Sequence, residues 1–239
     1  MAGLKLAALP RAVLFDVDFT LLQPTEMFYA DGYRRFGERF GLDLDVGRWD
    51  EAERAAYIAV KERRAGRGNA HDDGVYSAIA EVIVATMGGG DRAAVSACAA
   101  AIIAEWARTE NFTLYDDVRP CLERLRAAGL SIGLVSNSER DLSDVLEHFY
   151  LGDLIDGAVT SVEVGVMKPA PGIFAAALDC VGAAASDTVM VGDSYDDDVR
   201  GALGAGLAAG VLLDRRGGSP PRGLTIHTLA ELPPLLGLS

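Results

Sequence analysis

The sequence predicts an α/β fold: a doubly wound parallel sheet with a smaller all-helical domain inserted into it. Two observations lead to this prediction. Apolar, strand-like runs that stop in small or acidic polar residues alternate with stretches of helical spacing, a pattern typical of right-handed βαβ units with helices on both faces of one sheet. A long interval early in the chain, by contrast, shows helical spacing without a strand-like run.

Four runs are short and apolar enough to be strands buried on both faces of a parallel sheet. They cover residues 11–15, 131–137, 188–193 and 209–214. A shorter strand is expected at residues 158–160. Helical spacing predicts a helix over residues 118–128 that ends at Gly129, and another over residues 173–181 that ends at Gly182, because glycine is favoured just past a helix C-terminus.

The interval from residue 24 to residue 112 is predicted to be the helical insertion. Glycines break it near Gly41 and in two further clusters, which leaves room for about four helices of ordinary length. We interpret residues 24–112 as a cap domain, and residues 1–23 with 113–239 as the α/β core domain. The two connections between them are candidate hinges.

Composition and charge limit the classes of partner. Half of the 239 residues are hydrophobic, enough for a substantial core, and the formal net charge of -13 argues against nucleic acid as the main partner. No apolar stretch approaches the roughly 20 residues of a membrane span, and residues 1–10 have too short an apolar run for a secretory signal. We therefore expect a cytoplasmic protein without a membrane partner. Cys98, Cys121 and Cys180 lack the number and spacing of a disulfide framework or a zinc site.

Polar side chains stand at the ends of three predicted strands. They are Asp16, Asp18 and Thr20 after the first strand, Ser136 and Asn137 at the second, and Asp193, Asp196, Asp197 and Asp198 at the third, with Lys168 between the last two groups. In a parallel sheet such ends meet at one edge, where ligands gather. Aspartate, serine and threonine are also ordinary turn formers and helix caps, so each residue alone has a structural alternative.

In this order the motifs resemble those of the haloacid dehalogenase superfamily of phosphohydrolases: DxDxT, a strand-terminal serine or threonine, a lysine and a GDxxxxD-type acidic cluster. Here they read Asp16-Val17-Asp18-Phe19-Thr20, Ser136-Asn137, Lys168-Pro169 and Gly192-Asp193-Ser194-Tyr195-Asp196-Asp197-Asp198. The resemblance covers residues 11–213. It implies a Rossmann-like core, and the helical insertion after the first strand is similar to that of family members with an α-helical cap.

The resemblance implies a role for each carboxylate of the first motif. Asp16 would attack a phosphoryl group and form an aspartyl-phosphate, which divides one difficult hydrolysis into two displacements. Asp18 would protonate the leaving oxygen and then activate the water that cleaves the intermediate.

Four residues are expected to support the phosphate. Ser136 would donate its hydroxyl and Asn137 its backbone N–H to the phosphoryl oxygens. Lys168 would place a positive charge beside these oxygens and the nucleophile. Thr20 belongs to this set as the residue that fixes the loop or the orientation of the nucleophile.

Mg²⁺ is the expected cofactor, since it offsets the repulsion between a carboxylate and a phosphate dianion. By resemblance, its ligands are a carboxylate oxygen of Asp16, the backbone carbonyl of Asp18 and a carboxylate oxygen of Asp193. Asp198 would be a more distant acid that holds metal-bound water or the lysine. Whether Asp197 or Asp198 takes this outer position stays open, because acidic residues are also favoured in the first turn of a helix.

Basic side chains in the predicted cap have two interpretations. They are Lys61, Arg63, Arg64, Arg67 and His71. They could reach an anionic substrate, but mixed charges on a helix are more typical of its solvated face.

We predict a Mg²⁺-dependent phosphatase that acts on a small phosphorylated metabolite. A phosphomutase needs the same residues and stays an alternative. A 2-haloacid dehalogenase is less favoured, because its chemistry would leave Asp18 and the acidic cluster at Asp193 idle, and a noncatalytic binding protein would not need them either. The sequence does not indicate the physiological substrate or the oligomeric state.

Overall fold

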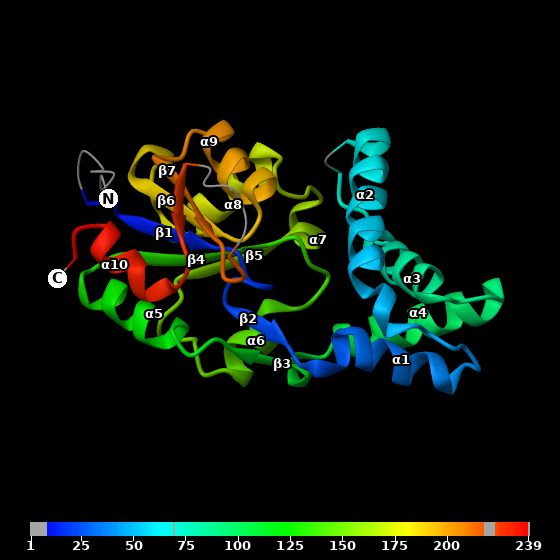
Figure 1. Cartoon of the computed structure of the whole chain (residues 1–239). Helices are drawn as coiled ribbons and strands as arrows, with labels where there is room; N and C mark the ends of the chain where they lie inside the picture. Colours follow the sequence, from blue (N-terminus) through cyan, green and yellow to red (C-terminus); the bar gives the residue numbers. More distant parts are fainter. Residues whose placement is uncertain (1–8, 69, 218–222, 239) are drawn as a thin grey trace. The chain divides into compact units, whose positions relative to one another are not determined.

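The computed structural model describes residues 9–68, 70–217 and 223–238, so most of the stretch considered above as a signal lies outside the described residues. The chain divides into two compact units (Figure 1). The core unit consists of Met1–Gln23 and Leu114–Ser239, and the insertion unit of Pro24–Thr113.

The core unit confirms the predicted parallel α/β fold, with one six-stranded sheet among its described residues. In spatial order the strands are β5 (Gly157–Thr160), β4 (Ser131–Ser136), β1 (Ala12–Phe15), β6 (Thr188–Gly192), β7 (Ala209–Leu213) and β8 (Leu224–Ile226). All neighbouring strands are parallel, and Phe15 of β1 lies opposite Leu134 of β4 and Val191 of β6. The carboxyl ends of these three strands therefore meet at one edge.

Helices cover both faces of this sheet. Figure 1 shows α8 and α9 on one side and α5 and α10 on the other. The helices of the core unit are α5 (Val118–Ala127), α6 (Leu142–His148), α7 (Ser161–Val164), α8 (Pro171–Val181), α9 (Gly201–Gly204) and α10 (Leu232–Leu235), with a π-helix at Tyr195–Arg200. Ala12 and Leu14 pack in one cluster with Ile173 and Phe174 of α8. Residues alternate between the faces of a strand, and all four residues of β1 are buried, so both faces carry a core.

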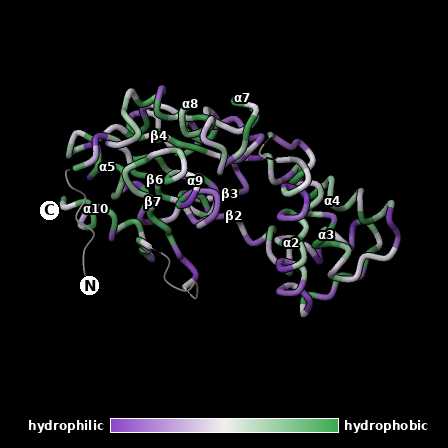
Figure 2. The backbone as a smooth tube through the Cα atoms, turned by 90° about the horizontal axis from the view of Figure 1, so that it is seen from above, coloured by the Kyte–Doolittle hydropathy of each residue, from purple (hydrophilic) through white to green (hydrophobic). Residues whose placement is uncertain are grey.

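Hydropathy follows this layering. In Figure 2 the strands β4, β6 and β7 are drawn mainly in the hydrophobic colour. Such nearly continuous apolar strands are typical of a parallel sheet covered on both sides.

The insertion unit is helical, as the sequence predicts. Its α-helices are α1 (Ala30–Arg39), α2 (Trp49–Arg67), α3 (Val75–Met87) and α4 (Arg92–Trp106). Gly68 and Gly88 directly follow α2 and α3. Their φ angles are 70° and 131°, and glycine is favoured there because a residue with a side chain rarely adopts such angles. Within the described ranges, no helix of the chain combines the length and the apolar character that crossing a membrane requires.

Three short strands are not predicted from the sequence. β8 extends the sheet beyond β7, and β2 (Leu22–Pro24) pairs with β3 (Phe112–Leu114) in a separate two-stranded sheet. Each has three residues, too few for an alternating or continuous apolar pattern to stand out.

Candidate active site

Asp16 lies directly after β1, and a tight turn brings Thr20 back to it. The backbone N–H of Leu21 donates to the carbonyl of Val17, and Phe19 adopts a left-handed φ of 64°. This conformation is uncommon for a residue other than glycine and costs free energy. The hydroxyl of Thr20, which is fully buried, donates to Oδ2 of Asp16 at 2.8 Å. The turn therefore orients the carboxylate of Asp16.

Lys168 lies between two carboxylates. Its Nζ donates to Oδ1 of Asp16 at 2.6 Å and to Oδ1 of Asp198 at 2.7 Å. Asn137 fixes the backbone of the lysine: its Oδ1 accepts from the Lys168 N–H at 2.6 Å, and its Nδ2 donates to the Lys168 carbonyl at 3.1 Å. The side chain of Asn137 thus positions the lysine, while the expected role of its backbone N–H toward phosphate stays a prediction.

The charges in this buried group depend on one another. Burial alone would lower the pKa of Lys168, but the negative charges of Asp16 and Asp198 outweigh it, and the net pKa is raised. The lysine is therefore an ammonium ion. Burial also raises the pKa of Asp198 to about 7, although Lys168 and the Ser194 N–H favour its ionised form.

Asp193 completes a cluster of three carboxylates. Asp16, Asp193 and Asp198 each offer an oxygen atom that lies within 4.8 Å of the others. Asp193 keeps contact with solvent, yet desolvation by the surrounding protein and the charges of Asp16 and Asp198 raise its pKa well above the ordinary value. Within the described residues its carboxylate has no hydrogen-bond partner. A set of hard oxygen donors with excess negative charge fits a Mg²⁺ ion.

The acidic segment after β6 contributes Asp198 to this cluster, and Gly192 makes room for it. A Cβ atom at Gly192 would overlap the Asp198 carboxylate, whose Oδ2 accepts from the Ser194 N–H at 2.9 Å. Asp196 instead pairs with Arg200 at 3.4 Å. Asp197 is half-buried and lies outside the carboxylate cluster.

Ser136 ends β4 and is 2% exposed. The alternative that it caps the following helix is wrong, because the cap of α6 is Asp141, which accepts from the Ser143 N–H at 2.8 Å. In the described part of the chain the Ser136 hydroxyl makes no hydrogen bond. It is free to donate one to a ligand.

Arg140 contacts the site, although it lies outside the motifs found in the sequence. Its Nη1 donates to Oδ1 of Asp18 at 2.8 Å, and its side chain is 3% exposed. The hydroxyl of Ser138 accepts from the Arg140 N–H at 2.9 Å and shapes the loop after β4. The sequence offers one signal for Arg140: it is an arginine that shortly follows a strand end, whereas the other strand ends of the chain are rich in carboxylates.

Two of the basic residues noted in the insertion unit pair with carboxylates of that unit. Arg63 forms a two-bond pair with Asp72, in which the Nη2–Oδ1 bond measures 2.8 Å. His71 Nε2 lies 2.9 Å from Oδ1 of Asp73. The side chain of Arg67 lies outside the described residues.

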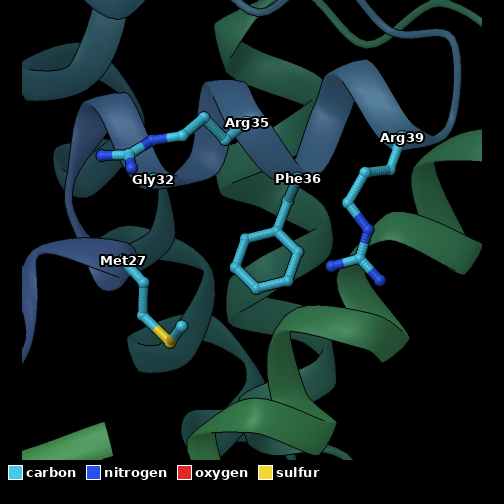
Figure 3. Close-up of a pocket in the computed structure, with 5 residues that line it drawn as sticks. All are labelled: Met27, Gly32, Arg35, Phe36 and Arg39. Atoms are coloured by element: carbon cyan, nitrogen blue, oxygen red, sulfur yellow. The ribbon is translucent and has the colours of Figure 1, made fainter.

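A cavity of about 170 Å³ lies at α1 of the same unit (Figure 3). It is lined by Met27, Gly32, Arg35, Phe36 and Arg39. The guanidinium carbon of Arg39 is 5.3 Å from the centre of the Phe36 ring. None of the basic residues singled out in the sequence lines this cavity.

Comparisons with known proteins agree with the motifs. Residues 10–206 match the model of a family described as haloacid dehalogenase-like hydrolase. The N-acylneuraminate-9-phosphatase of Rattus norvegicus is 30% identical over 95% of this chain and 93% of its own length. The ribulose-1,5-bisphosphate 5-phosphatase of Halopiger xanaduensis is 31% identical over 85% of this chain and 84% of its own.

A solved structure shares the fold. The HAD-hydrolase YfnB of Bacillus subtilis, whose structure was determined with bound magnesium, superposes with a TM-score of 0.71. It is 20% identical to this chain, and the match covers 96% of this chain and 99% of that one.

Proposed function

Because the chain belongs to the haloacid dehalogenase-like hydrolases, we propose that it is a phosphatase that hydrolyses a small phosphomonoester through a phosphorylated Asp16. One observation carries the proposal: both carboxylate oxygens of Asp16 are held, Oδ2 by Thr20 and Oδ1 by Lys168, beside the carboxylates of Asp193 and Asp198. A nucleophile held in this way needs little reorganisation to reach the phosphorus atom.

The first half of the reaction transfers the phosphoryl group. An oxygen of Asp16 forms a bond to phosphorus while the ester P–O bond breaks, and the proton of Asp18 goes to the leaving alkoxide. The products of this step are an alcohol and the phosphorylated Asp16. In the second half, Asp18 takes a proton from a water molecule whose oxygen attacks the phosphorus. The bond between phosphorus and the Asp16 oxygen breaks, which releases inorganic phosphate and restores the Asp16 carboxylate.

Asp16, Asp193 and Asp198, with the backbone carbonyl of Asp18, would hold Mg²⁺. When bound, this ion offsets the repulsion between the Asp16 carboxylate and the phosphate. Lys168, whose Nζ contacts both Asp16 and Asp198, would add a second positive charge beside the Asp16 carboxylate.

The phosphoryl oxygens would contact Ser136, the Asn137 N–H and Lys168. Ser136 supports this role because its hydroxyl has no competing partner among the described residues. Thr20 would act on the nucleophile, because its hydroxyl is already donated to Asp16.

The names of the two curated relatives suggest a substrate class. N-acylneuraminate 9-phosphate and the 5-phosphate of ribulose 1,5-bisphosphate are both esters of a primary hydroxyl on a polyhydroxylated carbon chain. We propose a substrate of this class.

The test is phosphate release from a panel of such esters, with and without Mg²⁺, by the wild-type chain and by Asp16→Asn. We expect Mg²⁺-dependent release that falls by about 10³-fold or more in the variant. Asp153→Asn, a change of the same kind at an exposed position, is the matched control and should keep full activity.

Four outcomes would contradict the proposal. Undiminished turnover by Asp16→Asn would remove Asp16 as the nucleophile. Metal-independent chloride release from a 2-haloacid would favour a dehalogenase, and recovery of the phosphoryl group on another substrate carbon, seen by phosphorus NMR, would favour a phosphomutase. No release from a broad panel would favour a noncatalytic binding protein.

A further inference from the structure

Arg215, just after β7, lies outside the motifs and contacts the loop that carries Thr20. We propose that Arg215 is a positioning residue that holds Asp16 in its attacking orientation by acting through Thr20. This inference rests on the proposed function of Asp16 as the nucleophile.

Two hydrogen bonds connect Arg215 to the turn after β1. Its Nε and Nη2 donate to the backbone carbonyl of Thr20 at 3.2 and 2.8 Å. On the other side of the same residue, the Thr20 hydroxyl donates to Oδ2 of Asp16 at 2.8 Å. Fixing the carbonyl of Thr20 restricts its backbone, and therefore the direction in which its hydroxyl points.

Arg215 is itself held firmly. Nη1 and Nη2 donate to the two carboxylate oxygens of Asp117 at 3.0 and 2.9 Å, the planar two-bond geometry for which arginine is suited. Its guanidinium carbon lies 3.7 Å from the centre of the Tyr115 ring. Asp117 also accepts from the Thr228 hydroxyl at 2.6 Å and from the Leu229 N–H at 2.8 Å. Because Arg215 is held in this way by the core unit, its hydrogen bonds restrict the motion of Thr20.

The tyrosine under Arg215 is part of the same arrangement. The backbone N–H of Tyr115 donates to the carbonyl of Leu21 at 3.1 Å, one residue after Thr20. Arg215 therefore contacts both the segment after the nucleophile, at Thr20, and the segment that follows the insertion, at Tyr115. A displacement of about 1 Å at a reacting group can cost about 10²-fold in rate, so such fixing matters for turnover.

A double-mutant cycle distinguishes a positioning role of Arg215 from a purely structural one. The variants are Arg215→Met, Thr20→Val and the double variant, with kcat and KM measured on the best ester of the panel and expressed per folded protein. Each single variant should lower kcat about 10- to 100-fold and leave KM within about twofold. If Arg215 acts through the Thr20 hydroxyl, the double variant should be no slower than Thr20→Val.

The cycle has a matched control and a replacement variant. Arg216→Met, at the exposed neighbouring position, should keep the wild-type kcat. If Arg215→Met does not fold, Asp117→Asn replaces it in the cycle, because it loosens the guanidinium without removing it. Losses that multiply in the double variant, or an unchanged kcat in Arg215→Met, would overturn the inference. A wild-type chain that releases no phosphate would overturn the proposed function instead.

Discussion

Arg140 donates a hydrogen bond to the carboxylate of Asp18 at 2.8 Å, and the exposed fractions of the two side chains are 3% and 16%. The pair holds in one place the residue that we propose as acid and base. Because Arg140 follows β4 and Asp18 follows β1, the bond also connects two neighbouring strand ends.

Replacing Arg140 by methionine should therefore lower kcat. General acid–base catalysis accelerates a reaction about 10²- to 10⁴-fold. A displaced Asp18 would keep part of this acceleration, so we expect kcat to fall about 10- to 100-fold. Steady-state phosphate release measures the change. Arg126→Met, which breaks the ion pair of Arg126 with Asp156 at 2.6 Å outside the strand-end cluster, is the matched control and should keep kcat. Equal losses in both variants would contradict a specific role of Arg140.

Mg²⁺ should stabilise the folded chain, because a ligand that binds only the folded state raises its stability by mass action. At about 100 times the dissociation constant, we expect the unfolding temperature of a chain of this size to rise by about 5–10 °C. Asp193→Asn removes a proposed ligand and should weaken binding about tenfold or more, so its shift at the same concentration is smaller. Differential scanning calorimetry measures both. An equal shift in the variant would show that Asp193 does not bind the metal.

Gly192→Ala should damage the site by steric overlap. The added methyl group would displace the Asp198 carboxylate, and with it the hydrogen bond to Lys168, so we expect about 1–3 kcal/mol of lost stability together with lost phosphate release. Gly204→Ala, where no atom lies within 4 Å of the added Cβ, is the control. It lies in α9 and should be neutral or stabilising by about 0.5–1 kcal/mol. Urea unfolding compares the two, and equal effects would contradict the overlap.

Asp117 should make stability depend on pH. Burial alone would raise its pKa, but hydrogen bonds from Arg215, Thr228 and the Leu229 N–H outweigh burial, and the net pKa is lowered. The ionised form of Asp117 therefore stabilises the fold fully at pH values above the ordinary pKa of about 3.9. This stabilisation is lost as the pH falls through the lowered pKa of the folded state.

Asparagine does not titrate, so the difference in unfolding free energy between the wild type and Asp117→Asn should be about 1–3 kcal/mol near neutral pH. It should shrink as the pH falls below about 4. Urea unfolding over a pH series measures it, with Asp153→Asn as the exposed control. A difference that is the same at every pH would contradict this account.

The long apolar strands could be predicted because each one combines a continuous buried run with a polar end. The spacing of the DxDxT motif likewise predicts Asp16, Asp18 and Thr20 as neighbours of one strand end. The short strand β8, by contrast, is defined by its pairing with β7, and nothing local distinguishes its three residues.

The contacts among distant residues could not be predicted for a similar reason. Arg140 and Arg215 reach carboxylates and carbonyls that lie 122 and 195 residues away in the sequence, and an arginine in a loop carries no motif. The side-chain role of Asn137 also depends on the fold, because its partner is the backbone of Lys168, 31 residues further on.

Every candidate residue of the proposed site belongs to the unit formed by Met1–Gln23 and Leu114–Ser239. The intervening residues contribute none of the groups that we propose to attack, protonate or bind the metal. In evolutionary terms, the insertion can therefore diverge, lengthen or be exchanged without altering a reacting group.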